Sequence, residues 1–214
     1  MGDNICSGLH GVAASNGDLP SLVARTGRYQ QRYDNGYRLV AGCVPFRYRY
    51  GCSIDKDMQD DLEVLMVTTQ GGPGLLFPKG GWETDETAEE AACREAYEEA
   101  GVRGDLKGYL GSWDFKSKRL QSPHSPEGRC RAYMFALIVK EELASWPEQD
   151  SRERCWISVA EAMEKCRYEW MKSVLEQCIL HLNTGQVNTF AAAALPSNLL
   201  NTEPPCPSHL RVKV

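Results

Sequence analysis

Residues 80–102 read GGWETDETAEEAACREAYEEAGV, and this stretch carries the clearest structural signal in the chain. Its centre predicts an α-helix over 87–100. Thr87 is followed three residues later by Glu90, which is the pattern of a capping box at a helix start. Gly101 suits the left-handed conformation that ends many helices. The stretch therefore predicts a glycine-rich loop that leads into a helix.

The helix has an unusual acidic side. On a helical wheel one face collects apolar residues, namely Cys93, Ala96, Tyr97 and Ala100, and is expected to pack on a sheet. Glu95, Glu98 and Glu99 gather on the opposite side, where like charges three or four residues apart repel one another. A divalent cation would relieve that repulsion, because carboxylate oxygens are its preferred ligands. The alternative is a solvated acidic face.

The surroundings of the helix decide between these alternatives. Gly80, five residues, Glu86, seven residues and then Arg94-Glu95-Ala96-Tyr97-Glu98-Glu99-Ala100-Gly101-Val102 resemble the Nudix box. Only Ala96 departs from that pattern, where a larger aliphatic residue is usual. The resemblance implies an α/β Nudix fold, with a mixed β-sheet sandwiched between α-helices in a single domain. It also implies a metal-dependent phosphoanhydride hydrolase.

The resemblance also implies roles for the residues of the motif. Glu95 and Glu99 would hold Mg²⁺ or Mn²⁺ with the Gly80 carbonyl. Glu98 would be a further metal ligand or the base that deprotonates water, and the pattern leaves open whether Glu95 or Glu98 is the base. Arg94 would orient the glutamates, and Glu86 would support the loop.

Flanking segments extend the resemblance to residues 23–182. In chain order they are QRYD at 31–34, Arg38, FPKGGWE at 77–83, RAYMF at 131–135, LIV at 137–139, Trp146 and RERCW at 152–156. Together they look like the diphosphoinositol polyphosphate phosphohydrolase branch, in particular its plant-type members. That branch implies diphosphoinositol polyphosphates, diadenosine polyphosphates or both as substrates.

Such polyanions need basic side chains that converge near the metal site. The candidates for substrate binding are Lys79, Gly81, Arg32, Arg38, Arg131, Arg152, Arg154, Lys116, Lys118 and Arg119. For each cation taken singly, a solvated surface charge is the competing interpretation. Lys79 is favoured because it adjoins Gly80.

Two other functions remain open. One is a Nudix hydrolase of smaller nucleotides, such as ADP-ribose, dinucleotide coenzymes or oxidised nucleoside triphosphates. The other is a non-catalytic module that binds polyphosphates, although such modules tend to lose the glutamates that are present here.

The rest of the chain fits one domain with two arms. We expect a flexible arm over 1–30, the hydrolase domain over 31–186 and a flexible tail over 187–214. Strands are predicted over 37–46, 62–69, 75–78, 106–115, 131–139 and 154–159, with polar insertions over 47–61 and 116–128. A second helical region, with a break allowed, is predicted from Ser158 to Leu182, because Ser158 and Glu161 form another capping box.

The composition of the chain limits the classes of partner that it can bind. The net charge of -5 argues against general binding to nucleic acid or membrane surfaces, so a local basic patch must serve a polyanionic small molecule. The nine cysteines lack metal-ligand spacing and favour reduced thiols. We expect a monomer in the cytoplasm, with the nucleus as a further location and mitochondria left open.

Overall fold

The computed structural model describes residues 23–25, 30–49, 61–69 and 73–184, apart from the side chain of Lys118. Most of the predicted N-terminal arm, residues 50–60 of the first polar insertion and the predicted tail lie outside these residues.

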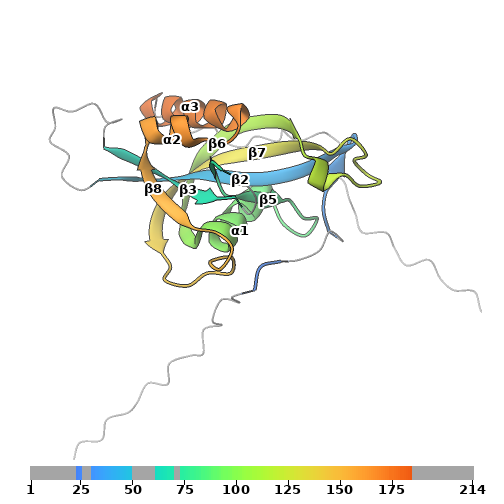
Figure 1. The fold of residues 1–214 in the computed structure, drawn as a ribbon, viewed down its shortest axis with the longest axis horizontal. Helices are drawn as coiled ribbons and strands as arrows, with labels where there is room; N and C mark the ends of the chain where they lie inside the picture. The colour runs from blue at the N-terminus through green and yellow to red at the C-terminus, as the bar shows by residue number, and fades with distance from the viewer. Residues whose placement is uncertain (1–22, 26–29, 50–60, 70–72, 185–214) are drawn as a thin grey trace, which may run out of the picture.

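The described chain forms one mixed sheet with helices on both faces (Figure 1). The strand order is β4-β3-β2-β7-β6, while β1 and β5 pair with β2, and β8 pairs with β3. The strands are β1 (Tyr33–Asp34), β2 (Tyr37–Tyr48), β3 (Leu62–Thr68), β4 (Leu75–Leu76), β5 (Lys79–Gly81), β6 (Val102–Lys116), β7 (Arg129–Glu142) and β8 (Arg154–Ser158). The central pair, β2 and β7, is parallel, and the other pairs are antiparallel.

Helices cover the two faces unequally. Helix α1 (Ala88–Ala100) lies on one face, and α2 (Val159–Lys165) and α3 (Glu169–Thr184) lie on the other (Figure 1). A short 3-10 turn, η1 (Lys118–Leu120), follows β6. The predicted arrangement of a mixed sheet between helices is therefore confirmed. None of the described helices is long and apolar enough to span a bilayer.

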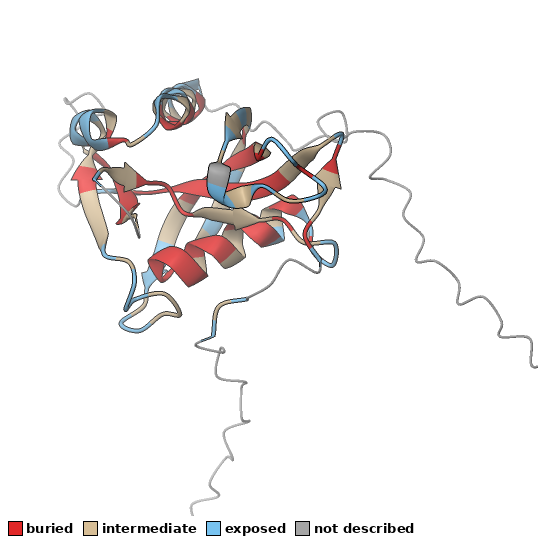
Figure 2. Ribbon diagram, turned by 45° about the vertical axis from the view of Figure 1, so that its right-hand side comes forward, coloured by how far each residue is buried: buried red, intermediate tan, exposed pale blue. Residues whose placement is uncertain are grey.

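The core lies around β2. Residues 39–46 of this strand are all buried, as expected for a strand covered on both faces (Figure 2). Gly42 allows β5 to lie close to β2, because a Cβ at this position would be 2.5 Å from the Pro78 carbonyl oxygen. Lys79 and Gly80 are thereby fixed against the middle of the sheet.

The predicted elements are present, with two omissions. All six predicted strands occur, although the one expected over 75–78 is only Leu75–Leu76. The short strands β1 and β5 were missed, because two or three polar or glycine residues give no alternating pattern. The second helical region is broken between Lys165 and Glu169, and the glycine expected to end it, Gly185, lies outside the described residues.

Candidate active site

Helix α1 begins and ends as its sequence predicts. The Thr87 hydroxyl accepts a hydrogen bond from the Glu90 amide at 3.1 Å, and the Glu90 carboxylate accepts one from the Thr87 amide at 2.8 Å. Gly101 has φ 61°, and its amide donates to the carbonyls of Ala96 and Tyr97. These caps fix the orientation of the helix behind the β5 loop.

The face of α1 that packs on the sheet agrees with the predicted one in part. Ala96 and Ala100 are fully buried as expected, while Cys93 and Tyr97 are only half-buried and Ala92 belongs to the buried face instead. The short side chains of these alanines bring α1 close to the sheet. As a result Glu95, Glu98 and Glu99 are only 7%, 6% and 5% exposed. The expected separation of an apolar face from an opposite acidic side was wrong, since Glu95 and Glu99 point towards β5.

Arg94 connects three of the acidic side chains. Its Nε and Nη2 donate to both oxygens of Glu86, at 2.9 and 2.8 Å. Its Nη1 donates to Glu95 at 2.7 Å and to Glu98 at 3.1 Å. Nη2 also donates to the Gly81 carbonyl at 2.8 Å, so one guanidinium joins the loop to the helix.

Glu95 and Glu99 meet β5. The Glu99 carboxylate accepts the Lys79 amide at 3.0 Å and pairs with the Arg152 guanidinium. At Gly80 a Cβ would overlap the carboxylate of Glu95, so only glycine leaves room for that group. The backbone of β5 and two glutamates of α1 therefore form one compact acidic site.

Burial makes the charges of this site costly. Burial, reinforced by the neighbouring Glu99 carboxylate, raises the pKa of Glu95 to about 8. Burial likewise raises the pKa of Glu98 and of Glu99 above their usual range. A hard divalent cation would stabilise the ionised form of these crowded carboxylates, because it supplies a positive charge beside them.

No three carboxylate, thiolate or imidazole groups converge as a ready cation cage in the described part of the chain. Each glutamate instead contacts an arginine or a backbone amide. The donor chemistry, the burial and the space left by Gly80 nevertheless suit Mg²⁺ or Mn²⁺, with Glu95, Glu98 and Glu99 as the available oxygens.

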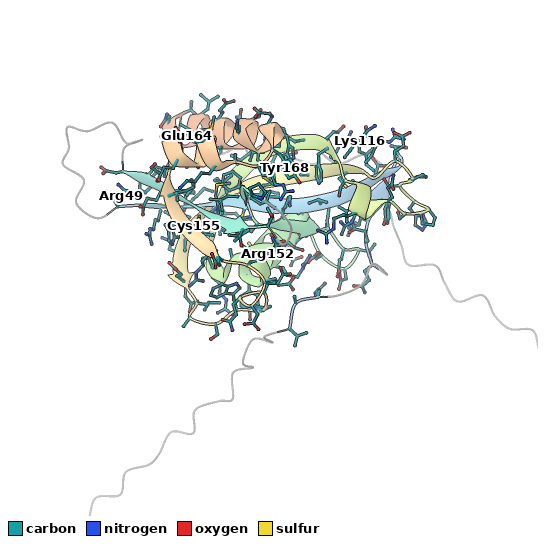
Figure 3. The ribbon with its side chains drawn as sticks, in the orientation of Figure 1. Arg49, Lys116, Arg152, Cys155, Glu164 and Tyr168 are labelled. Atoms are coloured by element: carbon teal, nitrogen blue, oxygen red, sulfur yellow. The ribbon has the colours of Figure 1, made fainter. Side chains whose placement is uncertain are left out.

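A cavity of about 580 Å³ opens beside Glu99 and Gly80. Five cationic side chains line it, namely Arg38, Lys79, Arg119, Arg152 and Arg167, against the single carboxylate of Glu99. A second cavity of about 590 Å³ shares Arg38, Lys79 and Gly80 with the first and extends towards Lys116, Phe115 and Trp170. Figure 3 labels Lys116, Arg152 and Tyr168 around this region. The two cavities are parts of one groove, which we call the cationic groove.

Some of the predicted substrate ligands lie in the cationic groove and others do not. Lys79, Arg38, Arg152, Lys116 and Arg119 line it. The side chain of Lys118 lies outside the described residues.

Four candidates for substrate binding contact other groups of the protein, namely Arg32, Arg154, Arg131 and Gly81. Arg32 donates to the carbonyls of Glu83, Thr84 and Glu86. Arg154 donates to the carbonyls of Ala100, Gly101 and Leu143, where it stabilises the C-terminal end of α1. These two arginines thus hold the loop and the helix, and neither lines the cationic groove, so their binding of substrate stays a prediction.

Arg131 and Gly81 also lie outside the lining of the cationic groove. Arg131 pairs with Asp114 at 2.7 Å, and its guanidinium lies over the Tyr37 ring. The Gly81 carbonyl is the acceptor for Arg94. For both, the structure shows a contact within the protein, and their contact with substrate stays a prediction.

Sequence reasoning missed Arg167, Tyr168 and Arg25. The first two stand in the turn between α2 and α3, which only the fold brings to the cationic groove. Arg25 lies in the predicted arm, yet its amide donates to Glu98 at 3.1 Å and its guanidinium to Glu83 at 2.8 Å. No spacing in the sequence connects these residues with the glutamates.

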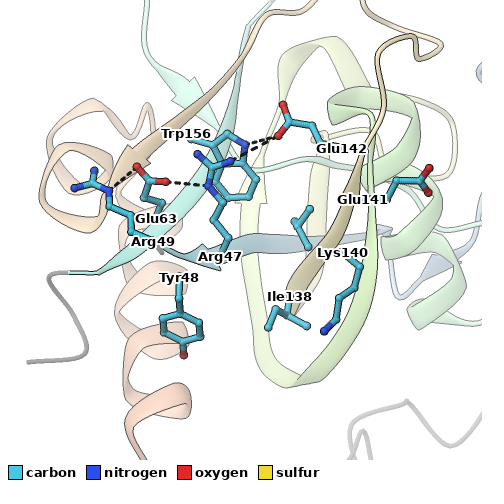
Figure 4. A pocket seen from close by; sticks show the side chains of 10 residues that line it. Arg47, Tyr48, Arg49, Glu63, Ile138, Lys140, Glu141, Glu142 and Trp156 are labelled. Atoms are coloured by element: carbon cyan, nitrogen blue, oxygen red, sulfur yellow. Dashed lines mark hydrogen bonds and ion pairs between the residues drawn. The ribbon is translucent and has the colours of Figure 1, made fainter. Parts of the chain in front are cut away.

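A further cavity, of about 730 Å³, lies at another part of the sheet (Figure 4). Glu63 pairs there with Arg47 and Arg49 at 2.9 and 2.8 Å, and the Trp156 indole donates to Glu142 at 2.9 Å. None of the glutamates of α1 lines it. Its lining has three cations and three carboxylates, so it lacks the excess of cations that marks the cationic groove.

Comparison with known proteins agrees with this geometry. The model of the NUDIX domain matches residues 48–178. Nudix hydrolase 16, mitochondrial, of Arabidopsis thaliana is 60% identical over 158 residues, which cover 72% of this chain and 86% of the relative. Diphosphoinositol polyphosphate phosphohydrolase 3-alpha of Mus musculus is 32% identical, over 71% of this chain and 87% of the relative.

A solved structure shows the same fold. An Ap4A hydrolase of C. elegans, in a binary complex, superposes with a TM-score of 0.51 at 19% identity, covering 68% of this chain and 98% of that one. The family match spans most of the described sheet and α1, and the relative from Arabidopsis is far above the level at which shared ancestry is evident. The chain therefore belongs to the Nudix hydrolase family.

Proposed function

We propose that this hydrolase cleaves phosphoanhydride bonds of diphosphoinositol polyphosphates, of diadenosine polyphosphates, or of both. The observation that carries the proposal is the cationic groove, which six cations and two carboxylates line in a protein of net charge -5. The cations are Arg38, Lys79, Lys116, Arg119, Arg152 and Arg167, and the carboxylates are Glu99 and Asp114. Such a local excess of positive charge favours a ligand with several phosphates over a smaller nucleotide with two.

The three buried glutamates of α1 have different roles in the proposed reaction. Glu95 and Glu99, with the Gly80 carbonyl, would hold Mg²⁺ or Mn²⁺. When bound, the cation neutralises the phosphates and lowers the pKa of a coordinated water. Glu98 takes the proton of the attacking water, and the rise in the pKa of Glu98 caused by burial strengthens it as a base.

The arginines and the lysine hold the parts in place. Arg94 fixes Glu95 and Glu98 on the helix and joins both to Glu86. Lys79 and Arg152 adjoin Glu99 and line the cationic groove, which suits them to receive a phosphate next to the acidic site. The substrate is a small molecule, and we propose that the enzyme acts on it as a monomer.

A panel of substrates tests the proposal. Purified protein is assayed with Mg²⁺ and with Mn²⁺ on a diphosphoinositol polyphosphate, diadenosine tetraphosphate, ADP-ribose and an oxidised nucleoside triphosphate. We expect the highest kcat/KM on one of the first two. A clear preference for ADP-ribose would contradict the proposed substrate class, and failure to release phosphate or nucleotide from any compound would contradict an enzymatic role.

The names of three relatives bear on the location of this protein in the cell. Three relatives from Arabidopsis, 60%, 54% and 53% identical to this chain, carry the word mitochondrial in their names. They give the expected cytoplasmic location no support, and we propose mitochondria as the location to test first. Fluorescent tagging of the full chain with a mitochondrial marker is the direct measurement.

A further inference from the structure

The lining of the cationic groove combines charged and aromatic side chains. Arg152 and Lys79 stand beside Glu99 near α1. The lining also includes aromatic residues, with Phe115 from β6, Trp170 from α3 and Tyr168 from the turn before α3. A ligand that fills the groove therefore meets both cations and aromatic surface.

The aromatic residues are not equivalent. Phe115 and Trp170 stack on each other, with ring centroids 5.0 Å apart and planes 9° apart, so each covers a face of the other. Tyr168 is 44% exposed and lines both parts of the groove. Of these three rings, the tyrosine offers the accessible surface.

The turn that carries Tyr168 is held firmly. The Arg167 amide donates to the Leu75 carbonyl at 3.0 Å, and its Nη1 donates to the Thr69 hydroxyl at 2.7 Å. Gly74, with φ +93°, lies against Arg167, and a Cβ there would be 3.0 Å from the Arg167 Cβ. The Arg167 guanidinium lies over the Tyr168 ring, 5.5 Å from its centroid, so a cation that can bind phosphate and an aromatic ring are neighbours in the groove.

We propose that Tyr168 determines specificity by stacking on the base of a nucleoside polyphosphate, while Arg167 binds an adjacent phosphate. A purine offers a planar face to an aromatic ring, whereas an inositol ring carries phosphates all round and has no such face. Arg167 can bind a phosphate of either substrate class, but Tyr168 can stack only on the base of the nucleotide. The inference rests on the proposed function, because it divides the two substrate classes named there.

The kinetic test compares Tyr168→Leu, Tyr168→Phe and Arg167→Gln with the wild type. Tyr168→Leu should raise KM for diadenosine tetraphosphate about 5-fold or more, and change KM for a diphosphoinositol polyphosphate less than about 2-fold. Tyr168→Phe keeps the ring and should behave as wild type. Arg167→Gln should weaken the binding of both substrates. Tyr48→Leu is the matched control, since Tyr48 is 40% exposed and lines the cavity of Figure 4 instead.

A binding test avoids turnover altogether. Calorimetry in Mg²⁺-free buffer compares ATP with tripolyphosphate, because the two carry the same number of phosphates and differ by the nucleoside. In the wild type ATP should bind more tightly, and Tyr168→Leu should remove that advantage while Tyr48→Leu keeps it. Thermal unfolding of each variant verifies that the fold is retained.

The outcomes separate the two proposals. Equal losses on both substrates, or no loss on either, would overturn the role of Tyr168. If the wild type hydrolyses neither substrate, the proposed function fails, and the comparison of ATP with tripolyphosphate still decides whether Tyr168 binds a base.

Discussion

Arg94 and Arg152 together show how charge is balanced in the acidic site. They contact four buried carboxylates, those of Glu86, Glu95, Glu98 and Glu99. With every group ionised, the four carboxylates and two guanidiniums carry a net charge of about -2. Burial, reinforced by the neighbouring Glu99 carboxylate, raises the pKa of Glu95, and a proton relieves this excess of negative charge in part while a divalent cation would relieve it fully.

Glu98→Gln should lower kcat by about 10²-fold or more, because the amide cannot accept the proton of the attacking water. The measurement is turnover at saturating substrate and Mg²⁺. Glu164→Gln is the control, since Glu164 is an exposed glutamate on α2. Near-normal turnover in Glu98→Gln would remove this residue from the mechanism.

Arg94→Ala should lower the free energy of unfolding by about 3 kcal/mol, because it leaves buried carboxylates without their partner. The Arg94 side chain is 14% exposed, so solvent replaces little of the lost pairing. Urea unfolding followed by circular dichroism measures the change. Arg103→Ala removes an exposed pair with Glu141 and should cost less than about 1 kcal/mol. Equal losses in the two variants would contradict a special role for Arg94.

At the scale of elements, local signals in the sequence were sufficient for both ends of α1, the start of α2 and the long strands. Both capping boxes occur as predicted, at Thr87 with Glu90 and at Ser158 with Glu161. The packing of α1 was predictable only in part from its apolar residues. Larger side chains such as Tyr97 suggested the buried face, but close contact with the sheet requires alanines and so buries the glutamates beside them.

In the candidate site, too, the sequence predicted some residues and missed others. The spacing of the motif named Gly80, Glu86, Arg94 and the three glutamates, and the structure brings them together. The basic residues were predicted from composition and short resemblances alone. Arg32 and Arg154 lie outside the lining of the groove, which was not predictable because a charge in the sequence does not reveal whether the side chain will meet carbonyl groups or a groove. Arg167 and Tyr168 were missed because a turn between helices approaches β4 only in the folded chain.

Gly80→Ala tests the junction of β5 with α1. The added methyl group would displace the Glu95 carboxylate, so Mn²⁺ should bind about 10-fold more weakly or worse. Calorimetric titration with Mn²⁺ measures the affinity, and Glu95→Gln serves as the comparison that removes the ligand itself. Unchanged Mn²⁺ affinity in a folded Gly80→Ala variant would show that Glu95 does not hold the cation.

Arg25→Ala tests the contact of the N-terminal segment with the acidic loop. Arg25 places a positive charge 2.8 Å from Glu83 and 4.0 Å from Glu86, which opposes a divalent cation nearby. Because the side chain is 45% exposed and screened by solvent, its removal should tighten Mn²⁺ binding only about 2- to 5-fold. Arg49→Ala removes a similarly exposed charge beside Glu63 and should leave the affinity unchanged.

At the scale of the whole molecule, charge is segregated. The chain carries a net charge of -5, while the cationic groove gathers six cations against two carboxylates. The cavity of Figure 4 has three cations, Arg47, Arg49 and Lys140, and three carboxylates, Glu63, Glu141 and Glu142, so its lining is balanced. A polyphosphate is therefore attracted to the cationic groove more strongly than to the cavity of Figure 4.

This segregation predicts how the reaction depends on salt. Raising NaCl from about 50 to 300 mM shortens the Debye length from roughly 14 to 6 Å, and should raise KM for a polyphosphate substrate several-fold while kcat changes less than about 2-fold. Initial rates at saturating Mg²⁺ measure both constants. Lys79→Met should raise KM at low salt and flatten its salt dependence, because Lys79 lines the groove next to Glu99. Lys140→Met removes an equal charge from the cavity of Figure 4 and should keep the steeper dependence of the wild type. If both variants flatten the dependence equally, the attraction comes from net charge and not from the groove.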